Sequence, residues 1–114
     1  MFERLEITRM AQGLAAHAGA RLGLIARNIA HADTPGYRAT DLPPFAKVYA
    51  EGPRNAPLRP ERVAGATDPN GNSVSLDDQM RRMVEARQSH EMALAIYRST
   101  SSVVRLALGR GGQG

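Results

Sequence analysis

The residues of this chain that most often do chemistry are its histidines and acids, and their spacing argues against a catalytic or metal site. His17, His31 and His90 lie far apart and show no ligand spacing. His90 and Glu91 begin the helical zinc-protease motif His-Glu-x-x-His, but Leu94 stands where the second histidine belongs. The chain has no cysteine, which excludes disulfides, thiolate metal sites and cysteine nucleophiles. We therefore expect no catalytic residues.

A second candidate is a polar run that echoes a calcium-binding loop. Asp68, Asn70 and Asn72 occupy its first three ligand positions. Ser73, however, stands at the position of the required glycine, and Gln79 at that of the bidentate glutamate. No glycine-rich phosphate loop and no activated Ser, Thr or Lys nucleophile is apparent. The sequence predicts a non-enzyme without metal or cofactor.

Composition and charge describe one small domain. The 114 residues are 42% hydrophobic but only 4% aromatic, so Ala, Leu, Ile, Val and Met must do the packing, as they do between helices. The net charge of +4 comes almost wholly from arginine and is not concentrated in one segment, unlike the basic face of nucleic-acid binders. We expect neither a cleaved secretory signal nor a membrane span, because no segment has the apolar run that either requires.

The N-terminal segment, residues 1–32, is predicted to form a helix from residue 3. Its apolar residues recur every three or four positions and make a narrow, alanine-rich stripe that suits a coiled-coil contact. Gly13, Gly19 and Gly23 each cost about 1 kcal/mol relative to alanine, so they either permit a close backbone approach or are simply tolerated. The stripe comprises Ile7, Ala11, Leu14, Ala18, Leu22, Ile25, Ile29 and Ala32.

Residues 33–74 contain all seven prolines and are predicted to form an irregular connecting segment. Pro35 and Gly36 fit the central positions of a type II turn. Phe45, Val48 and Tyr49 form a small apolar cluster suited to docking on a helix. A turn over residues 68–71 predicts a short β-hairpin between Val63 and Val74.

The C-terminal segment, residues 75–108, is predicted to be a second helix, followed by a disordered tail, residues 109–114. Ser75 fits the N-cap, two acids follow in the first turn, and Gly109 is a stop signal. One stripe repeats every seven residues, and a second apolar set lies on another face, which predicts contact with another subunit. The first stripe is Leu76, Met80, Met83, Arg87, His90, Leu94, Tyr97, Ser101, Val104 and Leu108, and the second set is Met92, Ile96, Val103 and Leu106.

These elements predict an all-α fold in which two long terminal helices pair as an antiparallel coiled coil, joined by the proline-rich segment with its short β-hairpin. The expected interface, within the pair and in assembly, places Leu14, Leu22, Ile25 and Ile29 against Met80, Met83, Leu94, Tyr97 and Val104.

Two segments resemble the axial proteins of the bacterial flagellum, the rod, hook and hook-associated family. Residues 28–41 resemble the family's N-terminal pattern N-(I/L)-A-N-A-x-T-P-G-Y, with His31 in place of the usual asparagine. Residues 71–80 are similar to the G-N-x-V-x-L-x-x-E-M that opens the C-terminal helix of proximal rod proteins, with Gln79 in place of glutamate. The matching residues of the first pattern are Asn28, Ile29, Ala30, Ala32, Thr34, Pro35, Gly36 and Tyr37.

The resemblance implies a structural subunit of the proximal rod of the flagellar basal body, in the periplasmic space. Such proteins leave the cell by type III export without a cleaved signal and assemble helically through their terminal helices. The implied partners are further copies of the chain, the rod proteins FlgC, FlgF and FlgG, the protein FliE, and the base formed by the MS-ring and export gate. No small-molecule substrate is implied.

A second hypothesis from a different class is a small basic helical adaptor that binds nucleic acid. It would require an arginine face on the second helix, where Glu85 and Glu91 interrupt the positive field. The arginines concerned are Arg81, Arg82, Arg87, Arg98 and Arg105.

Overall fold

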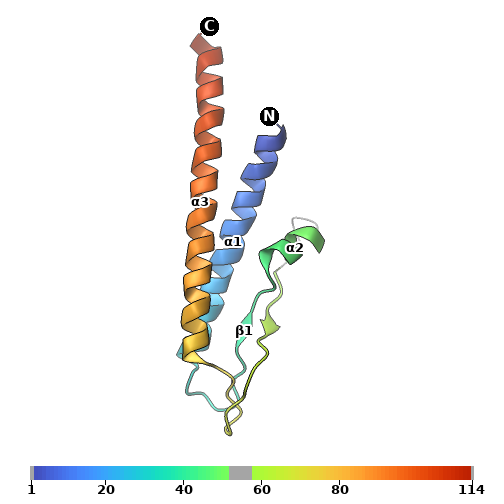
Figure 1. Ribbon diagram of the computed structural model, residues 1–114, viewed down its shortest axis with the longest axis vertical. Helices are drawn as coiled ribbons and strands as arrows, with labels where there is room; N and C mark the ends of the chain where they lie inside the picture. The colour runs from blue at the N-terminus through green and yellow to red at the C-terminus, as the bar shows by residue number, and fades with distance from the viewer. Residues whose placement is uncertain (1, 52–57, 114) are drawn as a thin grey trace.

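Two long helices lie side by side in the computed structural model, which describes residues 2–51 and 58–113 (Figure 1). They run in opposite directions, and a smaller arm stands beside them. The described molecule is mostly helical and elongated, with extents of 70 × 24 × 15 Å. The elements in order are α1 (Phe2–Ala30), β1 (Thr40–Asp41), α2 (Phe45–Glu51), β2 (Glu61–Arg62) and α3 (Leu76–Gln113).

The contact between α1 and α3 has small residues at its centre. In each helix one set of buried positions recurs every seven residues, and alanine predominates in the two sets, which lets the two backbones approach closely. These positions are Ala11, Ala18 and Ile25 in α1, and Gln79, Ala86 and Ala93 in α3.

The register of α3 differs from the prediction. Met80 is 59% exposed and Tyr97 is 39% exposed, so the centre of the contact lies one residue earlier, on the heptad that begins at Gln79. The error has a physical cause: the prediction followed large apolar side chains, whereas the buried positions carry a glutamine and alanines. Of the other residues expected in the contact, Ile25 is buried, and Leu14, Leu22, Ile29, Met83 and Leu94 are half-buried, while the side chain of Val104 lies outside the described part.

The ends of α3 were predicted with mixed success. Ser75 caps the N-terminus: its Oγ accepts a 3.3 Å hydrogen bond from the N–H of Asp78, and its carbonyl accepts one of 2.9 Å from Gln79. At the other end, the helix continues past the expected stop to Gln113. Gly109 does not adopt the positive φ that ends many helices, so the predicted disordered tail is helical as far as Gln113.

The arm comprises β1, α2 and β2. The helix α2 was not predicted; it begins beside Pro44, whose carbonyl accepts hydrogen bonds from the N–H groups of Lys47 and Val48. Docking of the apolar cluster is confirmed. The ring of Phe45 lies edge-on to His17 with centroids 5.6 Å apart, and the hydroxyl of Tyr49 donates a 3.2 Å hydrogen bond to Glu6 of α1.

The predicted hairpin is wrong in its pairing. The two-stranded antiparallel sheet pairs Thr40 with Arg62 and Asp41 with Glu61. The turn at residues 68–71 does form, since the N–H of Gly71 donates a 2.9 Å hydrogen bond to the carbonyl of Asp68. Beyond that turn, the N–H of Ser73 bonds to the carbonyl of Tyr37. The chain therefore pairs with the turn that follows α1 instead of folding back on Val63.

Candidate functional site

The two segments that carry the family resemblance meet at one end of the helix pair, and Asn28 is the centre of that junction. Asn28 is fully buried. Its Nδ2 donates to the carbonyl of Thr40 at 2.8 Å and to Oε1 of Gln79 at 3.0 Å. Its Oδ1 accepts from the hydroxyl of Tyr37 at 3.1 Å and from the N–H of Thr40 at 3.2 Å. One amide therefore links α1, the following turn, β1 and α3.

The type II turn after α1 is confirmed. The N–H of Tyr37 bonds to the carbonyl of Thr34 at 3.2 Å, and Gly36 has a φ of 77°. The N–H of Gly36 reaches the second turn, donating a 3.0 Å hydrogen bond to the carbonyl of Asn70. Gly71 has a φ of 86°, and a Cβ there would lie 3.2 Å from the Cα of Gly36. The two turns thus pack backbone against backbone, which requires a glycine at position 71.

A second buried amide, Asn72, closes the end of α1. Its Nδ2 donates to the carbonyls of His31 and Thr34, at 2.9 and 2.7 Å. Its Oδ1 accepts from the N–H of Val74 at 2.8 Å. Carbonyls at a helix end have no partner within the helix, so a side chain from the opposite end of the connecting segment performs the capping.

His31 begins the turn that follows α1 and contacts two residues within that turn. Its ring stacks on that of Tyr37, with centroids 4.6 Å apart and an interplanar angle of 15°. Its Nδ1 lies 3.2 Å from Oγ1 of Thr34. The histidine therefore keeps a short polar contact within the turn and adds an aromatic one, while its side chain stays at the surface.

The side-chain amide of Gln79 uses only one of its two polar atoms in this junction. Its Oε1 accepts the hydrogen bond from Asn28, a role that a carboxylate oxygen can also fill. Its Nε2 is buried and has no hydrogen-bond partner within the described residues. The junction therefore uses the oxygen of this side chain and leaves the amide nitrogen unpaired.

The remaining residues of the N-terminal pattern lie around this junction with less burial. Ile29 and Ala32 are half-buried, and Ala30, Thr34 and Pro35 are exposed. The pattern thus combines two buried or half-buried polar groups, Asn28 and Tyr37, with a turn that presents its outer side to solvent.

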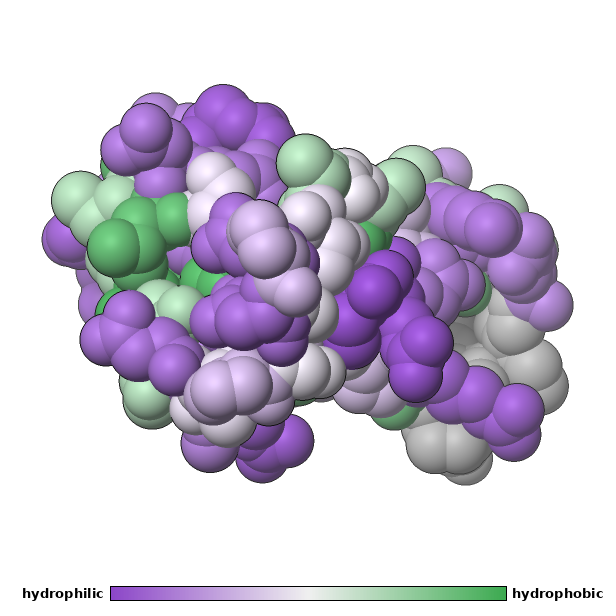
Figure 2. Space-filling view, turned by 90° about the horizontal axis from the view of Figure 1, so that it is seen from below, coloured by the Kyte–Doolittle hydropathy of each residue, from purple (hydrophilic) through white to green (hydrophobic). Residues whose placement is uncertain are grey.

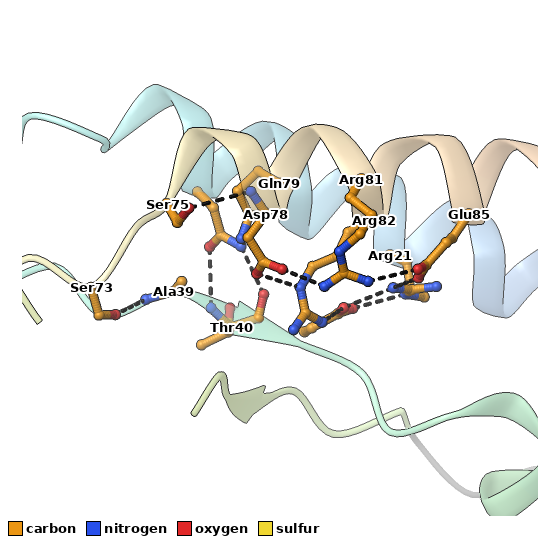
Figure 3. A network of polar contacts seen from close by, with 12 residues as sticks. Arg21, Ala39, Thr40, Ser73, Ser75, Asp78, Gln79, Arg81, Arg82 and Glu85 are labelled. Atoms are coloured by element: carbon orange, nitrogen blue, oxygen red, sulfur yellow. Dashed lines mark hydrogen bonds and ion pairs between the residues drawn. The ribbon is translucent and has the colours of Figure 1, made fainter. Parts of the chain in front are cut away.

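Next to the junction, a network of polar contacts links the arm to both long helices (Figure 3). Asp41 of the arm contacts Arg21 of α1 and Arg82 of α3. This carboxylate is buried. Arg21 of α1 binds both of its oxygens, at 3.0 and 2.9 Å, and Arg82 of α3 donates to Oδ2 at 2.6 Å. The N–H of Leu42 also donates to Oδ1, at 2.7 Å.

These contacts belong to a closed ring of six alternating charges. From Arg82 the ring continues to Asp78 at 2.7 Å, through Arg81, and on to Glu85 at 2.8 Å. Glu85 lies 3.6 Å from Arg21, which completes the circuit. Three arginines and three acids neutralise one another, so the ring holds the arm without leaving an unpaired charge.

The ring shifts the acidity of its members. Burial alone would raise the pKa of Asp41, but hydrogen bonds from Arg21, Leu42 and Arg82 outweigh burial and hold that pKa below its ordinary value. Asp78 follows the same pattern: hydrogen bonds from Arg82 and Arg81 overcome burial and lower its pKa. The hydrogen bond to Asp41 is the main cause of a raised pKa for Arg21. All of these groups are held in their charged forms.

A third attachment of the arm involves His17, which is buried on α1. Its Nε2 lies 2.7 Å from the carbonyl oxygen of Pro43, so this nitrogen carries the hydrogen and donates it. Sequence reasoning considered His17 only as a metal ligand. Its observed neighbours are a backbone carbonyl and the ring of Phe45.

Sequence reasoning also missed the roles of Arg21, Asp41 and Asn72. One signal was available: Arg21 and Asn28 follow Leu14 at intervals of seven, on the face of α1 that also carries apolar residues. Polar groups on a buried face require partners. The identity of those partners, 20 and 51 residues away, depends on the path of the arm.

No protein-family model matches this chain, and no curated protein matches it either. In the part of the chain that the structure describes, no group of three or more His, Cys, Asp or Glu side chains is placed to hold a metal ion. Over the same residues, no helix combines the length and apolar character needed to cross a membrane.

Proposed function

We propose that this protein is a structural subunit of the proximal rod of the bacterial flagellar basal body, of the FlgB type, without enzymatic activity. One observation carries the proposal. The two segments that resemble the axial proteins, residues 28–41 and 71–80, are far apart in sequence yet interlock through Asn28 and Asn72. A shared structural role explains why both patterns occur in one chain.

The pairing of α1 and α3 as an antiparallel coiled coil is part of this proposal. The seven-residue spacing of buried positions in each helix supports it, because that spacing is the repeat of a left-handed coiled coil. The contact relies on small residues such as Ala18 and Ala86, so the pair is held more by close approach than by a large apolar core.

Exposed apolar residues support assembly. α3 exposes large apolar side chains along its length, and α1 exposes them in its first two turns. Exposed apolar residues that gather on a surface in this way indicate a contact with another protein. The contacts within a single chain leave these apolar side chains exposed. The most exposed are Phe2, Met80, Val84, Leu106 and Leu108.

The partners and location follow from the same proposal. The subunit would contact further copies of itself, the rod proteins FlgC, FlgF and FlgG, the protein FliE and the base of the MS-ring and export gate, in the periplasmic part of the basal body. It would reach that location by type III export. The alternative within the family is that the chain is the sibling rod protein FlgC.

The nucleic-acid adaptor is the weaker alternative. Two of the five arginines that it requires, Arg81 and Arg82, are engaged by Asp78, Asp41 and Glu85. Arginines paired in this way are not free to neutralise phosphates. A gel-shift assay with duplex DNA at low salt tests this alternative, and we expect no binding.

Fractionation of flagellated cells tests the main proposal. A tagged chain should copurify with basal bodies, and its deletion should abolish motility. The double substitution Pro35→Ala with Gly36→Ala should leave export intact but block rod assembly. If export is lost instead, the turn is a targeting signal, and if the chain is absent from basal bodies, the proposed function is wrong.

A further inference from the structure

The C-terminal part of α3 extends past the end of its partner helix. α3 has 38 residues and α1 has 29, and in Figure 1 the C-terminus of α3 lies well beyond the N-terminus of α1. Ala93 is the last fully buried residue of α3 among the described side chains. We call residues 97–108 the basic end. Its exposed large hydrophobic residues are Tyr97, Val103, Leu106 and Leu108.

The charge of this end has one sign. From residue 92 onward the chain has three arginines and no acid. Arg98 and Arg105 are exposed, and neither forms an ion pair with another described residue. They are seven residues apart, which places them on one face of the helix, two turns from each other. The basic end therefore combines uncovered apolar surface with unpaired positive charge.

The opposite end of the molecule has the complementary character. We call residues 31–36 and 66–77 the acidic turn end, because they contain Asp33, Asp68 and Asp77 and no Lys or Arg. All three acids are exposed. Four arginines lie within four residues of these segments along the chain, namely Arg27, Arg38, Arg62 and Arg81. Arg81 is paired with Asp78 and Glu85.

Apolar surface adjoins these acids on α3. Leu76, Met80 and Val84 are 53%, 59% and 55% exposed. Their spacing of four residues makes them a continuous ridge on the helix surface. Figure 2 views the molecule from this end and shows green apolar residues gathered at one side, beside purple hydrophilic ones.

We propose that the basic end of one copy docks on the acidic turn end of a second copy, head to tail. Charge complementarity carries this assignment: the proposed contact brings Arg98 and Arg105 toward Asp33 and Asp77, whereas a symmetric contact would bring like charges together, which is unfavourable. The apolar ridge that begins at Leu76 covers the apolar residues of the basic end.

Such a contact uses two different surfaces, so each added copy leaves one of each free. Contacts of this kind continue into open arrays unless the rotation between copies closes them into a ring. The inference rests on the proposed function and specifies the partner, a second copy, and the two surfaces that meet.

Charge reversal of each end tests the inference in the purified full chain. Arg98→Glu with Arg105→Glu and, separately, Asp33→Lys with Asp77→Lys should each lower the apparent association constant about tenfold or more, measured by sedimentation velocity at low salt. The matched control is Arg59→Glu with Arg62→Glu, which makes the same charge change on exposed residues of the arm. This control should associate like the unaltered chain.

Mixing the two reversed variants gives the sharpest result. One variant then has an acidic end where the other has a basic one, so opposite charges face each other again and association should recover. Circular dichroism identifies a variant that fails to fold, and Arg98 and Arg105 are exposed side chains of α3.

Three results separate the proposals. Loss of association in both reversed variants, with recovery of association when they are mixed, supports the head-to-tail contact. Association that is unchanged by reversal, or that falls equally in the control, overturns the contact but leaves the rod assignment standing. An unaltered chain that stays monomeric at low salt, and is also absent from basal bodies, overturns both.

Discussion

Asn28 and Gln79 lie 51 residues apart in sequence, yet the side-chain amide of Asn28 donates a 3.0 Å hydrogen bond to the side chain of Gln79 at the buried end of the helix pair. This bond joins the two segments that resemble the flagellar axial proteins. The same amide holds Thr40 of the arm. The end of α1, the start of α3 and the start of the arm are therefore positioned together.

Removal of the Asn28 amide should destabilise the whole junction. Asn28→Ala leaves several buried polar groups without partners, so we expect the free energy of unfolding to fall by about 3 kcal/mol. Asn28→Asp keeps the two accepting contacts and loses both donated ones, and it should also destabilise the fold. Urea denaturation followed by circular dichroism measures both. Gln88→Ala, at an exposed site of α3, is the control, and an Asn28→Ala chain as stable as this control would refute the central role of the amide.

Asp41 should hold the arm against both helices. Asp41→Asn weakens the ion pairs to Arg21 and Arg82 and leaves their charges partly buried, so a loss of about 3 kcal/mol is expected. Hydrogen exchange should rise chiefly in the arm, at β1 and α2. The comparison is Asp77→Asn, an exposed acid in the first turn of α3, where only the helix-dipole interaction of about 0.5 kcal/mol is lost. Equal hydrogen exchange of the arm in the two variants would show that Asp41 does not hold the arm.

Acid should release the same contacts. The pKa values of Asp41 and Asp78 lie below their ordinary values, so in acid the unfolded chain binds more protons than the folded one. The stabilisation is therefore fully present above the unfolded pKa of about 4 and is lost as the pH falls through the lower folded values. The free energy of unfolding should decline between about pH 5 and pH 2. The double variant Asp41→Asn with Asp78→Asn should start lower and decline less, and an unchanged slope would exclude these two groups as the cause.

Gly36 and Gly71 should differ in their tolerance of alanine. Both have positive φ, so each substitution costs about 1 kcal/mol in backbone strain. No neighbour meets a Cβ at Gly36 within 4 Å, apart from its chain neighbours, whereas a Cβ at Gly71 would approach the backbone of Gly36 at 3.2 Å. Gly71→Ala should therefore be the more destabilising, as measured by thermal unfolding. If Gly36→Ala were the more destabilising substitution, the two turns would not pack as described.

Gly23 provides a test in which the substitution should raise the free energy of unfolding. It lies within α1, is exposed, and would meet nothing within 4 Å if it had a Cβ. Gly23→Ala should thus stabilise the monomer by about 1 kcal/mol, the difference in helix propensity. Gly13→Ala is the matched comparison, because its Cβ would touch the Phe45 ring at 3.4 Å, and it should gain less. A loss of stability at Gly23 would show that the glycine has a packing role within the folded chain.

Some parts of this fold follow from local chemistry, and the sequence predicted them. The long helices have apolar residues at helical spacing, Ser75 is a strong N-cap, and Pro35 with Gly36 can adopt few conformations other than the observed turn. Each of these depends on neighbours in sequence. The pairing partners of the strands do not, and the predicted hairpin between Val63 and Val74 was wrong for that reason.

The sequence alone therefore determined the local elements: two long helices, the turn at Pro35 and Gly36, and the polar pattern around Asn28. The tertiary structure decided which polar groups meet. The register of α3 depends on the hydrogen bond between Asn28 and Gln79. The position of the arm depends on the ion pairs of Asp41 with Arg21 and Arg82. Hydropathy could not predict either relationship, because a buried polar side chain is stabilised only by partners that the folded chain brings to it.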